Sequence, residues 1–132
     1  MPILSETREK LLSFACLHRR WNFGEGVPAK ELSLQRALAI LESLDDAGFS
    51  YTDAYPGLDG DILLSAYALP DYYDFKVKVD GSVTVTHTRG EEDKFYQEAM
   101  PLVEVFSNIK KFASEKWPTS DYLTSAFITA KS

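Results

Sequence analysis

The chain has 132 residues, 45% of them hydrophobic and 13% aromatic, which predicts one folded domain with a sizeable core. Twenty acidic residues against fourteen Lys and Arg give a formal net charge of −6, which argues against a protein that wraps nucleic acid or lies on anionic lipid. A single cysteine, Cys16, excludes an internal disulfide and a multi-thiolate metal site, and it favours a reducing cytoplasm. No apolar run approaches the roughly 20 residues of a membrane span, so we expect no membrane contact.

The first two segments carry the 3.6-residue apolar spacing of amphipathic helices. The first helix is predicted to begin at Ser5, as its N-cap, and to close on the basic residues 18–20. Trp21 opens a loop rich in glycine, and its ring is large enough to pin that loop to the core. Ser33 is predicted to cap the second helix, and Gly48 to end it.

Residues 49–88 show the period-two alternation and the turn residues of an antiparallel meander. The strands are expected at 49–55, 62–68, 73–78 and 83–88. The third of these carries Lys76 on its polar side, and the Asp80-Gly81 turn joins it to the fourth.

The sequence decides which residues pair across this last hairpin, because a shift of one residue would turn every side chain to the other face. A two-residue loop over Asp80-Gly81 would place Val77 opposite Thr84, so that neither face of the hairpin would be apolar throughout. A three-residue loop, with Gly81 left-handed in a bulge, restores an apolar face. The pairs predicted in this way are Val77 with Val83, Phe75 with Val85, Tyr73 with His87, and Lys76 with Thr84.

From Glu91 the spacing returns to 3.6 residues and predicts a long helix that ends at Trp117. Pro101 falls inside this pattern, and it either kinks the helix or starts a second one after a short break. The predicted fold is therefore α+β in two layers: two N-terminal helices, a four-stranded antiparallel meander and a long C-terminal helix. We expect a single domain over 1–117 and a tail over 118–132 that could dock on the domain or on a partner.

Catalytic chemistry finds little support in the sequence. His87 is the low-odds candidate for a general base, beside Tyr73, but a base needs an orienting carboxylate, and Asp74 lies on the opposite face of its strand. A histidine packed on a tyrosine in the core is the more frequent arrangement. The turn aspartates between residues 53 and 61 lack the spacing of a calcium loop, and no phosphate-binding glycine motif is present. We therefore assign no catalytic residue, no metal and no cofactor.

Binding finds more support, because the chain is rich in aromatic side chains. Lys76 and Lys78 lie near tyrosines, a combination that single-strand nucleic-acid binders use, but a solvated strand face explains the two lysines better, and lysines also guard an edge strand against unwanted pairing. Aromatic residues left outside the core would form a patch for a protein partner. The candidate binding residues are Trp21, Lys76, Lys78, Tyr122 and Phe127.

Four motifs occur in order between Trp21 and about Glu92, a little over half of the chain. They are the loop Trp21-Asn22-Phe23-Gly24-Glu25-Gly26, the helical Arg36-Ala37-Leu38, the strand entry from Pro56 through Asp59-Gly60 to Ile62, and the turn Asp80-Gly81. In these the chain resembles a loosely defined group of small bacterial proteins that share a Trp-(Asp/Asn)-x-x-Gly loop, a helix and an antiparallel meander. The resemblance implies an accessory protein of mobile or variable genomic regions, without an established activity or site residues. Members often end the second strand in Leu-Glu-Trp; here Leu64-Ser65-Ala66-Tyr67 stands there, so any role of that glutamate is absent.

These observations favour a small, non-enzymatic module of the bacterial cytoplasm that binds another protein, antitoxin-like or otherwise accessory to a mobile element. A homo-oligomer stays open, and nucleic acid is disfavoured. Two alternatives remain: a small enzyme or ligand binder with a pocket between sheet and helices, and a weak binder of single-stranded nucleic acid.

Overall fold

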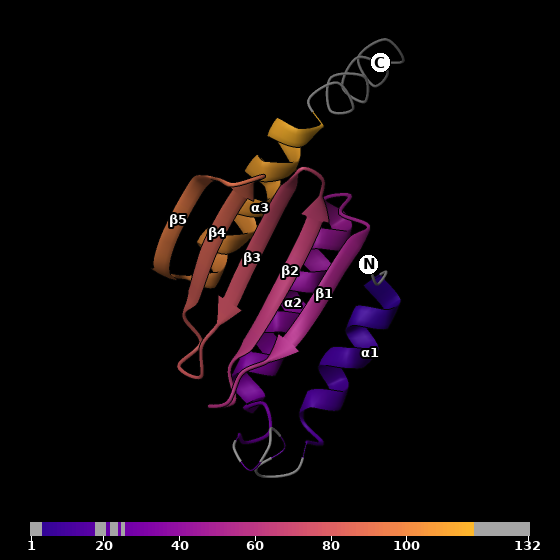
Figure 1. Cartoon of the computed structure of the whole chain (residues 1–132), viewed down its shortest axis with the longest axis vertical. Coiled ribbons are helices and arrows are strands. Elements are labelled where there is room, and N and C mark those ends of the chain that lie inside the picture. Colours follow the sequence, from indigo (N-terminus) through magenta and orange to yellow (C-terminus); the bar gives the residue numbers. More distant parts are fainter. Residues whose placement is uncertain (1–3, 18–20, 22–23, 25, 118–132) are drawn as a thin grey trace.

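A computed structural model describes residues 4–17, 21, 24 and 26–117. Its elements are α1 (Leu4–Phe14), α2 (Glu31–Asp46), β1 (Tyr51–Pro56), β2 (Ile62–Ala68), β3 (Asp71–Val77), β4 (Val83–Arg89), β5 (Glu92–Met100) and α3 (Leu102–Lys116). The strands form one antiparallel sheet in the order β1-β2-β3-β4-β5. Helices α2 and α3 lie behind one face of this sheet, and α1 packs beside β1 (Figure 1). The α+β class is confirmed, but the sheet has five strands where the sequence predicts four.

The fifth strand replaces the first part of the predicted C-terminal helix. Gly90, with φ +61°, lies in the turn that leads from β4 into β5, and the acidic residues 91–93, which the sequence suggests as a helix start, belong to this turn and to the strand. Helix α3 begins only after Pro101, because the proline ring is tolerated at a helix N-terminus and not in its interior. Of the two alternatives for Pro101, a helix start is confirmed, but strand β5 and not a first helix precedes it.

The hairpin of β3 and β4 has the predicted three-residue register. Tyr73 pairs with His87 and Val77 with Val83, and Gly81 has a φ of +88°. Lys76 is on β3, the central strand of the sheet, and Lys78 is in the turn directly after it, so neither guards an edge strand and that interpretation is wrong.

The core fills the space between the sheet and the helices, and it forms one cluster among the described residues. Alternate residues of the strands face it, and each large apolar side chain buried there stabilises the fold by about 1.5–3 kcal/mol. The largest fully buried side chains are Tyr73, Phe49, Phe75, Leu11, Ile40, Leu41, Leu44, Ile62, Leu64, Met100, Ile109 and Val77.

The predicted helix caps need correction. Ser5 lies inside α1, and Ser33 lies in the first turn of α2, where it is buried and its hydroxyl donates to the Gly60 carbonyl at 2.8 Å. Ser33 thus ties the helix to the loop between β1 and β2 instead of capping it. Gly48 follows the helix with a φ of +98°, as its position predicts.

The glycines of three loops meet long side chains around α2. A Cβ atom on Gly26 would lie 2.6 Å from Nε1 of Trp21, one on Gly60 2.7 Å from Cγ of Lys30, and one on Gly81 2.7 Å from Nε of Arg36. Each of the four motifs on which the bacterial resemblance rests supplies a residue to these contacts, and the Gly81–Arg36 contact joins two of the motifs. The motifs therefore serve packing, since each glycine makes room for a neighbour.

The Gly81 contact can be separated from backbone strain by a matched pair of variants. Gly90 also has a positive φ, but a Cβ atom added there would meet nothing within 4 Å, so Gly90→Ala bears only the backbone cost. We expect Gly90→Ala to lower the free energy of unfolding by about 1 kcal/mol and Gly81→Ala by about 2 kcal/mol. Urea denaturation measures both, and equal losses would refute the Arg36 contact as a constraint.

Candidate functional site

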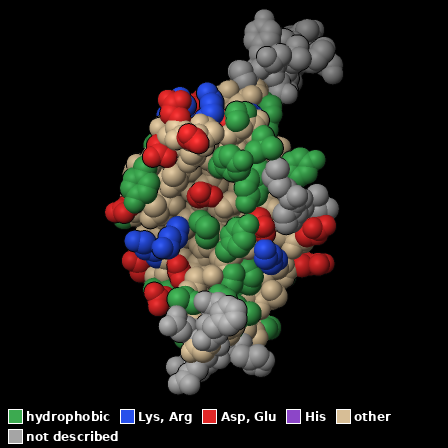
Figure 2. All heavy atoms as spheres, in the orientation of Figure 1, with side chains coloured by type: hydrophobic (Ala, Val, Ile, Leu, Met, Phe, Trp, Pro, Cys, Tyr) green, Lys and Arg blue, Asp and Glu red, His purple; other side chains and the backbone are tan. Residues whose placement is uncertain are grey.

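Among the residues that the structure describes, no helix packs on one face of the sheet, and this face carries five tyrosines. Figure 2 views this face and shows apolar side chains gathered along its middle, with isolated acidic and basic side chains among and around them. We call it the tyrosine face; its tyrosines are Tyr51, Tyr55, Tyr67, Tyr72 and Tyr96. Tyr51 is 51% exposed and Tyr96 61% exposed, although both are large and partly apolar. An exposed aromatic surface of this kind is typical of a binding face.

The strand register arranges the tyrosine face in rows. Tyr51, Tyr67 and Tyr72 stand side by side on β1, β2 and β3, and the rings of Tyr67 and Tyr72 meet edge to face at 5.7 Å. Tyrosine has only two side-chain torsions, so rings held against one another lose little further freedom when a partner binds. The row is therefore a preorganised contact surface.

The next row is polar and occupies the middle of the face. Asp53 accepts from Lys10 Nζ at 2.7 Å, and the buried Ser65 donates to Asp74 Oδ1 at 2.6 Å. Burial raises the pKa of Asp53, but the hydrogen bond from Lys10 and its other donors outweigh burial and leave that pKa below its usual range. The middle of the face therefore presents carboxylates between tyrosines.

A hollow of about 370 Å³ lies where the tyrosine row reaches the end of the sheet. Tyr51 and Tyr67 form one side of it, and Leu69 and Trp117 are among the other residues that line it. Trp117 is fixed there by an edge-to-face contact with the buried Phe49 at 4.9 Å. An apolar hollow next to exposed aromatics can accept an anchoring side chain.

The structure separates the candidate binding residues of the sequence. Lys76 lies on the tyrosine face, 3.9 Å from Asp61, and Lys78 is exposed at the hairpin end. Trp21 lies far from both in the chain, over Gly26, where its Nε1 donates to the Val27 carbonyl at 2.9 Å. Trp21 therefore stabilises its own loop. The predictions for Tyr122 and Phe127 fall outside the described residues.

A second polar cluster lies on the opposite, helix-covered side of the sheet. Asp71 of β3 is 1% exposed, and three donors from two elements surround it: His87 Nε2 at 2.7 Å, Arg89 Nε at 2.8 Å and Lys116 Nζ at 2.8 Å. The sequence-based expectation that no carboxylate reaches His87 is wrong. Asp74 does face away from it, but Asp71 shares the face of Tyr73 and stands next to His87.

The charge state of this cluster follows from its contacts. Burial raises the pKa of Asp71, but the hydrogen bonds from Lys116, His87 and Arg89 hold it well below its usual range. An ionised carboxylate only accepts, so His87 Nε2 carries the proton that it donates. Burial, with the nearby Asp71, raises the pKa of Tyr73 to about 12, so this phenol stays protonated at neutral pH and cannot act as a base.

Next to the cluster lies a pocket of about 350 Å³, which we call the His87 pocket. His87 stacks on Tyr73 with ring centroids 4.4 Å apart, and Phe112 packs against both rings. Its lining consists of His87, Arg89, Lys94, Phe95, Lys111, Phe112 and Glu115. This lining has an imidazole held by a carboxylate, but no serine, threonine or cysteine that could serve as a nucleophile.

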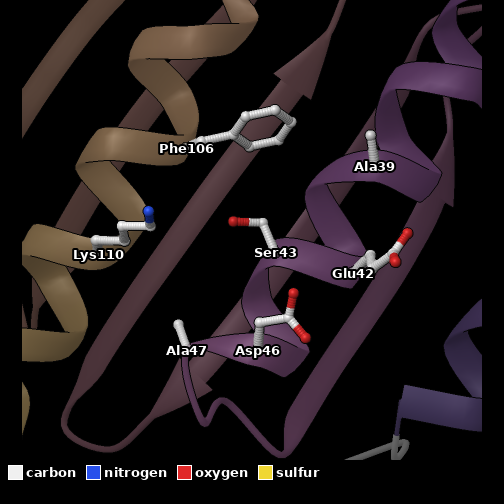
Figure 3. Close-up of a pocket in the computed structure, with 7 residues that line it drawn as sticks. All are labelled: Ala39, Glu42, Ser43, Asp46, Ala47, Phe106 and Lys110. Atoms are coloured by element: carbon white, nitrogen blue, oxygen red, sulfur yellow. The ribbon is translucent and has the colours of Figure 1, made fainter.

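A third hollow, of about 390 Å³, runs between α2 and α3 on the outside of the helix layer. Figure 3 shows Phe106 of α3 and Ser43 of α2 pointing toward one another across it, with Lys110 on the α3 side. Glu42 and Asp46 are the other charged residues of its lining. These charged groups are of mixed sign and do not converge, so the groove has no recognisable chemistry.

Metal sites, membrane spans and known relatives add no further assignment. Within the described parts of the chain, no three His, Cys, Asp or Glu side chains are grouped to hold a metal ion, and no helix is long and apolar enough to cross a membrane. No known protein family matches the sequence, no curated protein matches it, and no solved structure matches the fold. The bacterial resemblance therefore stays a prediction.

Asp71 is the residue that sequence reasoning missed. The signal was present, because Asp71 and Tyr73 are two residues apart and side chains two apart share a face of a strand. The apolar alternation predicts a strand only from residue 73, which leaves Asp71 in the turn before it. A buried carboxylate that joins β3, β4 and α3 should matter for stability.

We expect Asp71→Asn to lower the free energy of unfolding by about 2–4 kcal/mol, because Lys116 and Arg89 lose their shared anion. Since the folded-state pKa of Asp71 is lowered, the wild-type contribution is fully present above about pH 4 and is lost as the pH falls through the folded value. The variant should lack this acid-dependent part. Urea unfolding at neutral and acidic pH measures it.

The exposed turn residue Asp59 offers the matched control. Asp59→Asn removes the same charge from the chain without touching a buried contact, and it should leave stability near that of the wild type. Equal losses in the two variants would contradict a structural role for the Asp71 cluster.

Proposed function

We propose that this chain is a non-enzymatic binding module whose partner is another protein, and that the tyrosine face is its contact surface. The observation that carries the proposal is the single-sided covering of the sheet. All five tyrosines of that face stand where no helix of the described chain packs.

The composition of the face supports a protein partner. Tyrosine is enriched in protein interfaces, since its ring contributes apolar contact and its hydroxyl contributes hydrogen bonds at low entropic cost. The hollow beside Tyr51 and Tyr67 is suited to one large apolar side chain of the partner, which would act as the anchor. The polar row with Asp53 and Asp74, together with the net charge of −6, favours a partner whose contact surface is basic.

The two alternative functions receive less support. The His87–Asp71 pair meets one requirement of general-base catalysis, yet Asp71 is shared with two cations and the pocket lining holds no serine, threonine or cysteine for His87 to activate. For nucleic acid, the basic residues near the tyrosines in the described chain are Lys76 and Lys10. Lys76 stands beside Asp61 and Asp74, and Lys10, whose Nζ lies 4.8 Å from the Tyr55 ring centroid, is paired with Asp53, so carboxylates offset both charges. An antitoxin-like role stays a prediction within the favoured function.

Truncating Tyr51 tests the proposal. Tyr51→Ala removes a half-exposed ring that lines the hollow, and it should weaken capture of the partner from source cells by about 30-fold, the effect of losing one central interface aromatic. Quantitative mass spectrometry of the captured protein, followed by titration of the purified pair, measures the loss. Raising the salt concentration should slow association with a basic partner.

Val103 provides the control, because it is 70% exposed on α3, on the far side of the molecule. Val103→Ala should leave capture unchanged, and equal weakening by both variants would contradict the tyrosine face as the interface. Sedimentation of the pure chain tests a second copy as occupant. If Tyr122→Ser with Phe127→Ser strengthens capture, the chain's own tail competes for the hollow.

A further inference from the structure

The His87 pocket concentrates positive charge on an acidic chain. Four of the fourteen basic residues meet at this corner: Arg89, Lys94 and Lys111 on the pocket lining, and Lys116 behind it on Asp71. The carboxylates that face them are Asp71, Glu92 and Glu115. The pocket lining itself carries three cations, Arg89, Lys94 and Lys111, and one anion, Glu115, although the whole chain carries −6.

These cations differ in how many of their hydrogen-bond donors are already paired with a carboxylate. Arg89 gives its Nε to Asp71, which leaves the terminal nitrogens of its half-exposed guanidinium without a partner among the described residues. Lys94 contacts Glu92 at 3.0 Å, and that carboxylate is itself largely exposed to water. Lys111 has no ion pair with any described residue, and its side chain is exposed at the pocket.

The inner wall of the pocket is aromatic and fixed. Phe112 is buried, and its ring lies 5.8 Å from Phe95 and 5.3 Å from His87. His87 is held in turn by Tyr73 and Asp71. The flat apolar part of a ligand can lie against these rings while its charged group contacts the basic residues at the rim. Small-ligand sites commonly combine an apolar wall with a few polar groups in this way.

From this combination we propose that the His87 pocket binds a small organic anion: an aromatic or similarly flat compound that bears a phosphate or carboxylate group. The volume of about 350 Å³ suits a single-ring compound. Arg89 contributes fork-like donors to the anionic group, and Lys94 and Lys111 contribute point charges on either side. This site is separate from the tyrosine face, because it lies on the helix-covered side of the same sheet.

Phenyl phosphate is the probe for this proposal. In an NMR titration of the full chain at low ionic strength, it should give saturable shifts of the amide signals of His87, Phe95 and Phe112. Benzoate should shift the same signals, inorganic phosphate should bind more weakly because it lacks the ring, and neutral benzyl alcohol should give no saturable shift. If phenyl phosphate at millimolar concentration produces none, or if its shifts fall elsewhere, the proposal is overturned.

Two neighbouring lysines on α3 supply a matched pair of variants. Lys111 lines the His87 pocket, whereas Lys110 lines the groove between α2 and α3, and both are exposed, so neither substitution should disturb folding. Lys111→Gln should weaken phenyl phosphate binding by about fivefold, as one partly screened charge contact supplies. Lys110→Gln makes the same change in net charge and should leave binding unaltered. Equal weakening by the two would show attraction by overall charge alone and would refute the site.

Discussion

The three helices in the described part of the chain all lie on one face or at one edge of the five-stranded sheet, and this one-sided covering governs the rest of the molecule. All the large buried side chains of the strands point to the side where α2 and α3 pack, and α1 closes that side at β1. The alternation of side chains along each strand then places the intervening residues on the uncovered face. Tyr72 and Tyr73 illustrate the consequence, because adjacent residues of one strand belong to the exposed face and to the core.

The helix-covered side must also accommodate charge, and it does so through one carboxylate. Asp71 is buried at the start of β3, where β4 contributes His87 and Arg89 and α3 contributes Lys116. An unpaired carboxylate in this position would be strongly unfavourable, so its three donors must be in place when α3 docks. The same arrangement orients His87 and brings Arg89 to the mouth of the His87 pocket, so that one buried anion positions the basic residues around that pocket.

The parts of the fold that follow from local rules could be predicted from the sequence. The register of the β3–β4 hairpin is one example, since only one parity leaves Val77, Phe75 and Tyr73 on a common apolar face. Strand β5 is the opposite case: it is an edge strand exposed along most of its length, so its sequence lacks alternation, and its acidic start imitates a helix N-terminus. Ser33 resembles an N-cap for a similar reason, because only the loop that folds back onto it, through Gly60, shows what its hydroxyl binds.

The candidate sites were predictable to different degrees for the same reason. Tyrosines at alternate strand positions could be seen in the sequence, but which face the helices would leave open depends on contacts between distant residues. The His87 pocket joins residues of β4, β5 and α3, and its β5 contribution lay in a segment expected to be helical, so its basic residues could be seen individually but not as a group.

The edges of the sheet indicate why a partner would meet its face instead of adding a strand. At β1, helix α1 packs along the strand, and Thr7 donates its hydroxyl to the Thr52 carbonyl at 3.1 Å. At β5, two register irregularities and the charged residues Glu92, Lys94 and Glu98 interrupt a regular row of backbone groups. Both devices disfavour edge-to-edge pairing. With the edges protected and one face covered by helices, the tyrosine face is the large surface of the sheet that remains for recognition, and its hydroxyl-bearing rings keep that surface compatible with water until a partner binds.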